Sequence, residues 1–127
     1  MKNLESDFAR IGDIDDNLEV SVGSRNGELL PHFHVWDKGT RGENFHVRIE
    51  IGRNAYFGYG RNDAVLDFRQ RKMLVDFLNR KPQRTDAFSS HWDAILTLWN
   101  LSDSAIVVDE TLPTPDYSTI TGTDDNV

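Results

Sequence analysis

Apolar and polar residues alternate along much of the first half of the chain, which is the pattern of strands that bury one face. The alternation is clearest in FHVRIEI, residues 45–51, where every second residue is apolar. Residues 18–24, 32–37 and 55–59 show the same period, and 8–14 shows it poorly. Turn-forming residues separate these stretches, so we predict an antiparallel meander of about five strands.

The spacing of apolar residues becomes helical in the next segment, NDAVLDFRQRKMLVDFLNRKP, residues 62–82. A helix is predicted that begins at Asp63 or, if a strand extends through Leu66, near Asp67. Pro82 is expected to end it, because proline cannot continue a helix.

A second helix is predicted in TDAFSSHWDAILTLWNLSD, residues 85–103, with Thr85 or Asp86 as its cap. Because neither helix is expected to be stable alone, both should dock on the sheet. The apolar stripe of the second helix consists of Phe88, Trp92, Ile95 and Trp99.

Strands followed by helices, rather than alternating with them, are typical of α+β proteins. We therefore predict an antiparallel sheet with two helices packed on one face, in a single domain over residues 1–110. AIVVDE, residues 105–110, could add a last edge strand. Residues 111–127 are rich in Pro, Thr and Asp and poor in large apolar side chains, so we expect an acidic, flexible and poorly ordered tail.

The composition excludes several classes of protein. The 127 residues fit one domain, and the absence of cysteine excludes disulfides and thiolate–metal sites. The acidic start, residues 1–16, resembles neither a signal peptide nor a membrane anchor. No window approaches the roughly 18 consecutive apolar residues of a membrane-spanning helix. We expect a soluble, cytoplasmic protein without a membrane partner.

The net charge of −7 is unevenly distributed. Residues 1–37 carry −5 and residues 85–127 carry −8, whereas residues 38–84, with eleven Lys and Arg against five acidic residues, carry +6. A basic middle can bind a polyanion, or it can be neutralised by the acidic tail of the same chain. Within it, RQRK (69–72) and NRKPQR (79–84) could touch nucleic-acid phosphates or form a solvated helix face.

The segment PHFHVWDK, residues 31–38, carries His32 and His34 at alternate positions, and His46 follows in the next predicted strand. If the apolar residues of these strands face the core, the histidines and Trp36 project from the other, water-facing side.

The register of this hairpin stays open between two possibilities that both match the apolar faces. His34 lies opposite either Arg48 or His46. Either register gathers three imidazoles on one face of one strand pair.

Three imidazoles on a strand pair can hold a divalent transition metal such as zinc. A metal held by His32, His34 and His46 would allow a metal-dependent hydrolase or nuclease with Glu50 as general base. The same side chains could instead be structural, or form a binding surface, because an exposed Trp beside His and Arg is typical of interface centres. That predicted surface consists of His32, His34, Trp36, His46 and Arg48.

The function predicted from these features is that of a small non-enzymatic interaction domain. Its protein or nucleic-acid partner would bind the outer sheet face, and the basic segment 38–84 would contact a nucleic acid. The metal-dependent hydrolase or nuclease is the alternative. Exposed hydrophobic edge strands also allow a homodimer.

PHFHV, followed by a hairpin, a helix and WDAILTLWN, resembles small bacterial domains of unknown function whose hallmark is a Pro-His-[Phe/Val]-His-Val motif. The resemblance covers residues 28–101 and implies an α+β fold without an assigned activity. Residues 1–27, the acidic tail and the long connection 38–44 depart from the family pattern, so shared partners do not follow from it.

Overall fold

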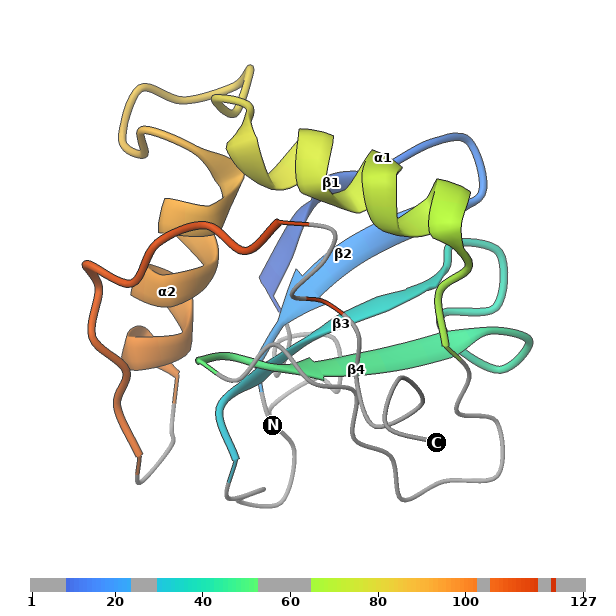
Figure 1. Cartoon of the computed structure of the whole chain (residues 1–127), viewed down its shortest axis with the longest axis horizontal. Coiled ribbons are helices and arrows are strands. Elements are labelled where there is room, and N and C mark those ends of the chain that lie inside the picture. Colours follow the sequence, from blue (N-terminus) through green and yellow to red (C-terminus); the bar gives the residue numbers. More distant parts are fainter. Residues whose placement is uncertain (1–8, 24–29, 53–64, 103–105, 117–119, 121–127) are drawn as a thin grey trace, which may run out of the picture.

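The structure is a computed structural model that describes residues 9–23, 30–52, 65–102, 106–116 and 120 (Figure 1). These residues form four strands followed by two helices, which confirms the α+β class. No helix among the residues described is long and apolar enough to cross a membrane.

The strands form one antiparallel sheet in the order β1-β2-β3-β4, so each strand pairs with the next along the chain (Figure 1). This is the predicted meander, and the predicted strand at 55–59 lies outside the described residues. The four strands are β1 (Ala9–Asp13), β2 (Leu18–Val22), β3 (His32–Asp37) and β4 (His46–Glu50).

The first helix, α1 (Phe68–Asn79), begins at the later of the two predicted positions. The Asp67 carboxylate accepts a hydrogen bond from the backbone N–H of Gln70, and the Gln70 side chain accepts one from the backbone N–H of Asp67. This reciprocal capping box satisfies two N–H groups at the helix start and fixes it there.

The second helix, α2 (His91–Leu101), begins later than predicted. Neither Thr85 nor Asp86 caps it. The Ser90 hydroxyl accepts the backbone N–H of Asp93 at 3.0 Å and so supplies the cap. The connection between the two helices is therefore longer than the sequence pattern predicted.

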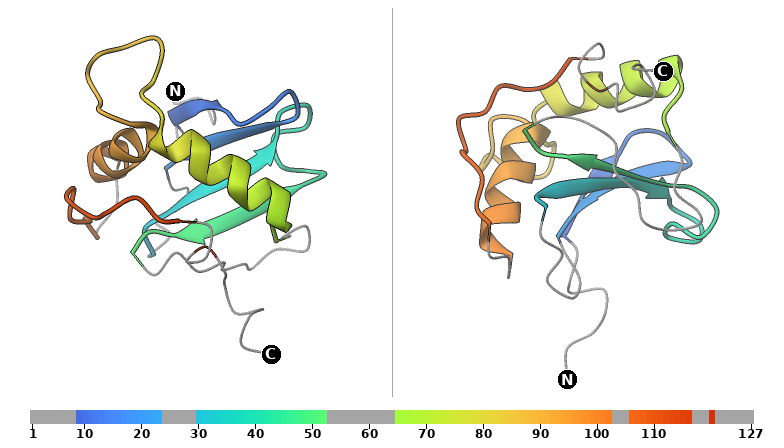
Figure 2. Two further views of the ribbon diagram at one scale, coloured as in Figure 1. Left: turned by 45° about the horizontal axis from the view of Figure 1, so that its top comes forward. Right: turned by 60° about the horizontal axis from the view of Figure 1, so that its bottom comes forward.

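Both helices and the sheet share one apolar core. α1 runs across the strands, and α2 stands beside them (Figures 1 and 2). Phe33 of β3 meets Trp92 of α2 with ring centroids 6.0 Å apart. The fully or nearly fully buried core includes Val20, Phe33, Val35, Val47, Ile49, Leu74, Phe77, Leu78, Trp92, Ile95 and Trp99.

The chain after α2 returns along that helix and does not form the edge strand predicted at 105–110, since residues 106–110 have no strand partner. Side chains of α2 take up its backbone groups instead. Trp99 Nε1–H donates to the carbonyl of Ile106 at 2.8 Å, and Asn100 both donates to and accepts from the backbone of Val108, each at 2.8 Å.

The segment predicted as a poorly ordered tail is anchored to the core at two or more points. Trp92 Nε1–H donates to the carbonyl of Leu112 at 3.0 Å, and Leu112 packs against the core. Pro115 is buried, and Ile120 is fully buried. The described part of this segment, residues 111–116 and 120, thus contacts the core, while 117–119 and 121–127 lie outside the described residues, so the poorly ordered tail over 111–127 stays a prediction.

Candidate functional site

The β3–β4 hairpin adopts the first of the two predicted registers, in which His34 lies opposite Arg48 and Trp36 lies opposite His46. Three imidazoles gather as predicted. Nδ1 of His34 lies 2.7 Å from Nε2 of His46, and the ring centroids of His32 and His34 are 4.8 Å apart.

The prediction that these side chains face water is wrong for three of them. His32 is 0% exposed, His34 is 2% exposed and Trp36 is 6% exposed. His32 packs against Trp99 of α2, with ring centroids 5.4 Å apart. The alternation shows which side chains point away from the apolar face, but it does not show that the second face is also covered.

The loop between β3 and β4 accounts for part of this cover. The guanidinium of Arg41 lies 5.7 Å from the Trp36 ring centroid. Gly42 has a φ of 101° and lies so close to Trp36 that a Cβ atom there would be 3.1 Å from the ring. The positive φ favours glycine here, since other residues seldom adopt this conformation, and a Cβ atom would in addition press against the Trp36 ring.

Hydrogen bonds assign the protons of the buried histidines. His34 Nε2–H donates to the carbonyl of Gly23 at 3.4 Å, which leaves Nδ1 to accept the Nε2–H of His46. His32 Nδ1–H donates to the carbonyl of Leu30 at 2.6 Å. Burial, with His32 and His46 nearby, holds the pKa of His34 well below its usual value, so its ring is neutral at neutral pH.

This arrangement gives no support to the metal-dependent alternative. Within the part of the chain that the structure describes, no three His, Asp or Glu side chains are placed to hold one ion. The lone pair of His34 Nδ1 already accepts from His46, and Glu50, the carboxylate expected to act as base, lies across from His32. The hydrogen bonds support a structural role for the cluster.

A second polar network, not foreseen from the sequence, starts on the same sheet face. Trp36 Nε1–H donates to the buried carboxylate of Glu19 at 3.0 Å, and Glu19 also accepts from Arg10 Nε at 3.0 Å. Arg10 further binds Asp13 at 2.6 Å, and Asp13 binds Lys38 at 2.8 Å. The network ties Arg10 in place at the edge strand.

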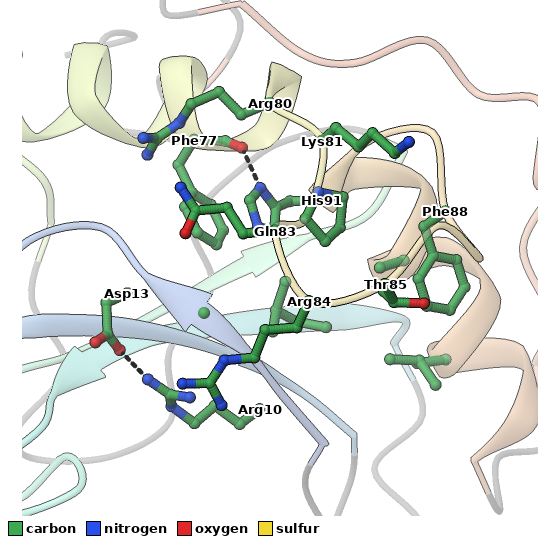
Figure 3. Close-up of a pocket in the computed structure, with 15 residues that line it drawn as sticks. Arg10, Asp13, Phe77, Arg80, Lys81, Gln83, Arg84, Thr85, Phe88 and His91 are labelled. Atoms are coloured by element: carbon green, nitrogen blue, oxygen red, sulfur yellow. Dashed lines mark hydrogen bonds and ion pairs between the residues drawn. The ribbon is translucent and has the colours of Figure 1, made fainter.

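Arg10 also lines a cavity of about 470 Å³, here called the basic cavity, which is large enough for a small ligand (Figure 3). Its walls come from β1, from the end of α1, from the α1–α2 connection and from α2. The lining residues are Arg10–Asp13, Phe77, Arg80–Thr85, Phe88, His91, Ala94 and Leu98.

The basic cavity combines four cations with one carboxylate, that of Asp13. Three of the cations, Arg80, Lys81 and Arg84, belong to the NRKPQR segment, which was predicted either to contact phosphates or to form a solvated helix face. They line the cavity because α1 ends at Asn79 and the chain turns there. RQRK lies earlier, on α1, and does not line the cavity.

The four cations differ in how far they are already neutralised. Arg10 is paired with two carboxylates, and Lys81 binds Asp86 at 2.8 Å on the surface. Arg80 lies over the Phe77 ring, 5.8 Å from its centroid. Arg84 makes no ion pair with the described residues and extends toward β1 (Figure 3). It is therefore the cation most available to an anion.

His91 forms part of the cavity wall where α2 begins. Its Nδ1–H donates to the carbonyl of Phe77 at 2.8 Å, and its ring stacks on the Phe77 ring with centroids 3.9 Å apart (Figure 3). Burial lowers the pKa of His91, so the neutral ring keeps Nε2 as an acceptor. Nε2 lies beside Gly12 and makes no hydrogen bond to the residues described.

Sequence reasoning found part of this site. The cations after α1 were visible as a run, but Arg10 was missed because the alternation in 8–14 is poor, and His91 was not singled out within the predicted second helix. No signal short of the fold itself places Arg10 opposite Arg84.

Comparisons with known proteins add no assignment. No protein-family model, no curated protein and no solved structure matches the chain. The resemblance to the PHFHV domains stays a prediction.

Proposed function

We propose that this protein is a non-enzymatic binding domain that holds a nucleic-acid partner by its phosphates at the basic cavity. The observation that carries the proposal is that four cations line one cavity in which Asp13 is the single lining carboxylate. Arg10 lies far in sequence from the other three, which are Arg80, Lys81 and Arg84. Cations gathered in this way are the usual means of holding phosphates.

The proposal keeps the predicted interaction domain but moves its binding surface. The outer sheet face around His32, His34 and Trp36 is buried, so its centre is not open to a partner. Arg84, Arg80 and Lys81, by contrast, are exposed.

The type of cation supports phosphate as the bound group. Three of the four are arginines, whose planar guanidinium matches phosphate oxygens in pairs. The overall charge of −7 does not prevent this, because acidic residues are concentrated outside segment 38–84. Binding is therefore local, and it should weaken as salt screens it.

The test compares two exposed arginines of the basic segment 38–84, Arg84 and Arg69. Arg84→Gln removes the least neutralised cation of the cavity, and Arg69→Gln removes an exposed cation of α1 that does not line it. Binding of a fluorescein-labelled single-stranded oligonucleotide is followed by anisotropy between low and moderate salt. We expect Arg84→Gln to weaken binding several-fold and to lower the slope of log K against log salt by about 0.7, the value for one lost phosphate contact.

The control variant, Arg69→Gln, should keep the affinity of the wild type and its slope of log K against log salt within error. Equal losses in the two variants would show diffuse attraction and overturn the proposal. Failure of the wild type to bind at low salt would also overturn it.

A further inference from the structure

We infer that the basic cavity receives one unstacked nucleotide of a single strand, with its phosphate at the cations and its base inside. This inference rests on the proposed function and names the form of nucleic acid that fits. It follows from the volume of the cavity and from its uncharged and aromatic lining residues, in addition to its cations.

The cavity is too large for a phosphate contact alone. Its volume of about 470 Å³ lies within the range of sites that enclose small organic ligands. Besides the cations, the lining includes the apolar side chains of Ile11, Ala94 and Leu98. A bound group that filled this space would need an uncharged part that contacts these side chains, in addition to its anionic part.

Aromatic lining favours a planar ring as that part. Phe88 lines the cavity and is only half-buried, so its ring retains surface that a ligand can cover. The stacked rings of His91 and Phe77 also line the cavity. Nucleic-acid bases stack on aromatic side chains regardless of sequence.

Nε2 of His91 adds a requirement for a hydrogen-bond donor. With Nδ1–H committed to the carbonyl of Phe77, Nε2 of the neutral ring accepts but does not donate. A ligand for this cavity therefore carries an anion, a planar ring and an N–H or O–H group. Nucleotides have all three, whereas an acidic peptide supplies carboxylates without the ring.

The cavity also distinguishes single strands from duplexes. In a duplex the bases are stacked inside and the phosphates line the outside, so the apolar walls would contact nothing. A base that leaves the stack can enter, and the cost is least in a single strand.

The test uses the full-length chain and three probes of increasing size: inorganic phosphate, ribose 5-phosphate and adenosine 5′-monophosphate. Affinities are measured by NMR titration of backbone amide signals. We expect the nucleotide to bind at least about fivefold more tightly than ribose 5-phosphate, the lower end of the effect of stacking one base. A single-stranded oligonucleotide should also bind more tightly than a duplex of the same sequence.

Two matched variants locate the effect. Phe88→Ala should abolish the advantage of the nucleotide over ribose 5-phosphate while leaving phosphate binding unchanged. Phe68→Ala removes an exposed ring of α1 that does not line the cavity and should change neither. Far-UV circular dichroism confirms that both variants are folded.

The outcomes separate this inference from the proposed function. Equal affinities for nucleotide and ribose 5-phosphate, with Arg84-dependent oligonucleotide binding intact, would overturn the inference alone. Tighter binding of a glutamate-rich or phosphoserine peptide than of the nucleotide would overturn it in favour of a protein partner. Absence of binding to every nucleic-acid probe would overturn both.

Discussion

The imidazoles of His34 and His46 share one hydrogen bond, with Nδ1 of His34 and Nε2 of His46 2.7 Å apart. His34 lies within the sheet face and is 2% exposed, whereas His46 is half-buried at the start of β4. The bond joins the two strands of the hairpin through their side chains as well as through their backbones.

Replacing either partner should destabilise the hairpin, and the two losses should be coupled. His34→Ala leaves a void and removes the acceptor of the His46 N–H. We therefore expect the free energy of unfolding to fall by about 2–4 kcal/mol. His46→Ala should cost less, because its site is more open. Urea unfolding of both single variants and the double variant measures the coupling, expected near 1 kcal/mol. Strict additivity would contradict a bond between the two rings.

Stability should fall as the pH is lowered through the range where free histidine titrates. The pKa of His34 in the folded chain is depressed, first by burial and then by His32, His46 and Arg48, while the unfolded chain titrates near 6.5. At lower pH the unfolded state therefore binds a proton at His34, whereas the folded state does not. The contribution of His34 to the free energy of unfolding should be complete above about pH 7 and should decline as the pH falls below about 6.5.

A variant without the ring tests this assignment. Urea unfolding at pH 7.5 and pH 5.0 should show a smaller difference for His34→Gln than for the wild type. Part of the slope should persist, because burial also lowers the pKa of His91. An unchanged slope in the variant would show that His34 does not titrate on unfolding.

Asp37 should control the order of the β3–β4 loop that covers Trp36. One carboxylate oxygen of Asp37 accepts the backbone N–H groups of Gly42 and Phe45, and the other accepts the backbone and hydroxyl of Thr40. In Asp37→Ala, amide hydrogen exchange at Gly42 and Phe45 should become faster, as NMR can measure.

A turn of the same kind supplies the control for Asp37. Asp15 accepts the backbone N–H groups of Asn17 and Leu18 in the β1–β2 turn, so Asp15→Ala should speed exchange there and leave the β3–β4 loop unchanged. The hydrogen bonds, first that from Thr40, lower the pKa of Asp37 to about 2. The loop should therefore keep its protection at pH 4 and lose it only as the pH approaches that value. Loss already at pH 4 would contradict this assignment.

The sequence predicted the elements of the sheet better than their surroundings. Period-two alternation in FHVRIEI predicted both the strand and its buried face, since the Val47 and Ile49 side chains must leave water together. The same alternation could not show that this second face is covered too, because the cover of His32 comes from Trp99 of α2, which lies far along the chain, and that of Trp36 from Arg41 in the β3–β4 loop.

Helix starts and the C-terminal segment show a different limit. Thr85, Asp86 and Ser90 are all good caps by residue type, and in the fold Ser90 is the cap at the point where Trp92 and Ile95 of α2 enter the core. The apolar run at the start of AIVVDE predicted an edge strand, yet side chains of α2 bind the backbone of Ile106 and Val108, which no local pattern encodes. Local chemistry therefore predicted the elements, and contacts between distant segments decided the site.

Asn100 should hold the C-terminal segment against α2. Its side-chain amide donates to the carbonyl of Val108 and accepts the N–H of the same residue, each at 2.8 Å, so one side chain satisfies both backbone groups. Asn100→Ala should lower the free energy of unfolding by about 1–2 kcal/mol, the value for two such bonds. Asn79→Ala, which removes only a bond to Val75 within α1, should cost less. Hydrogen exchange at Val108 should accelerate in the first variant alone, and equal exchange in both would refute this role.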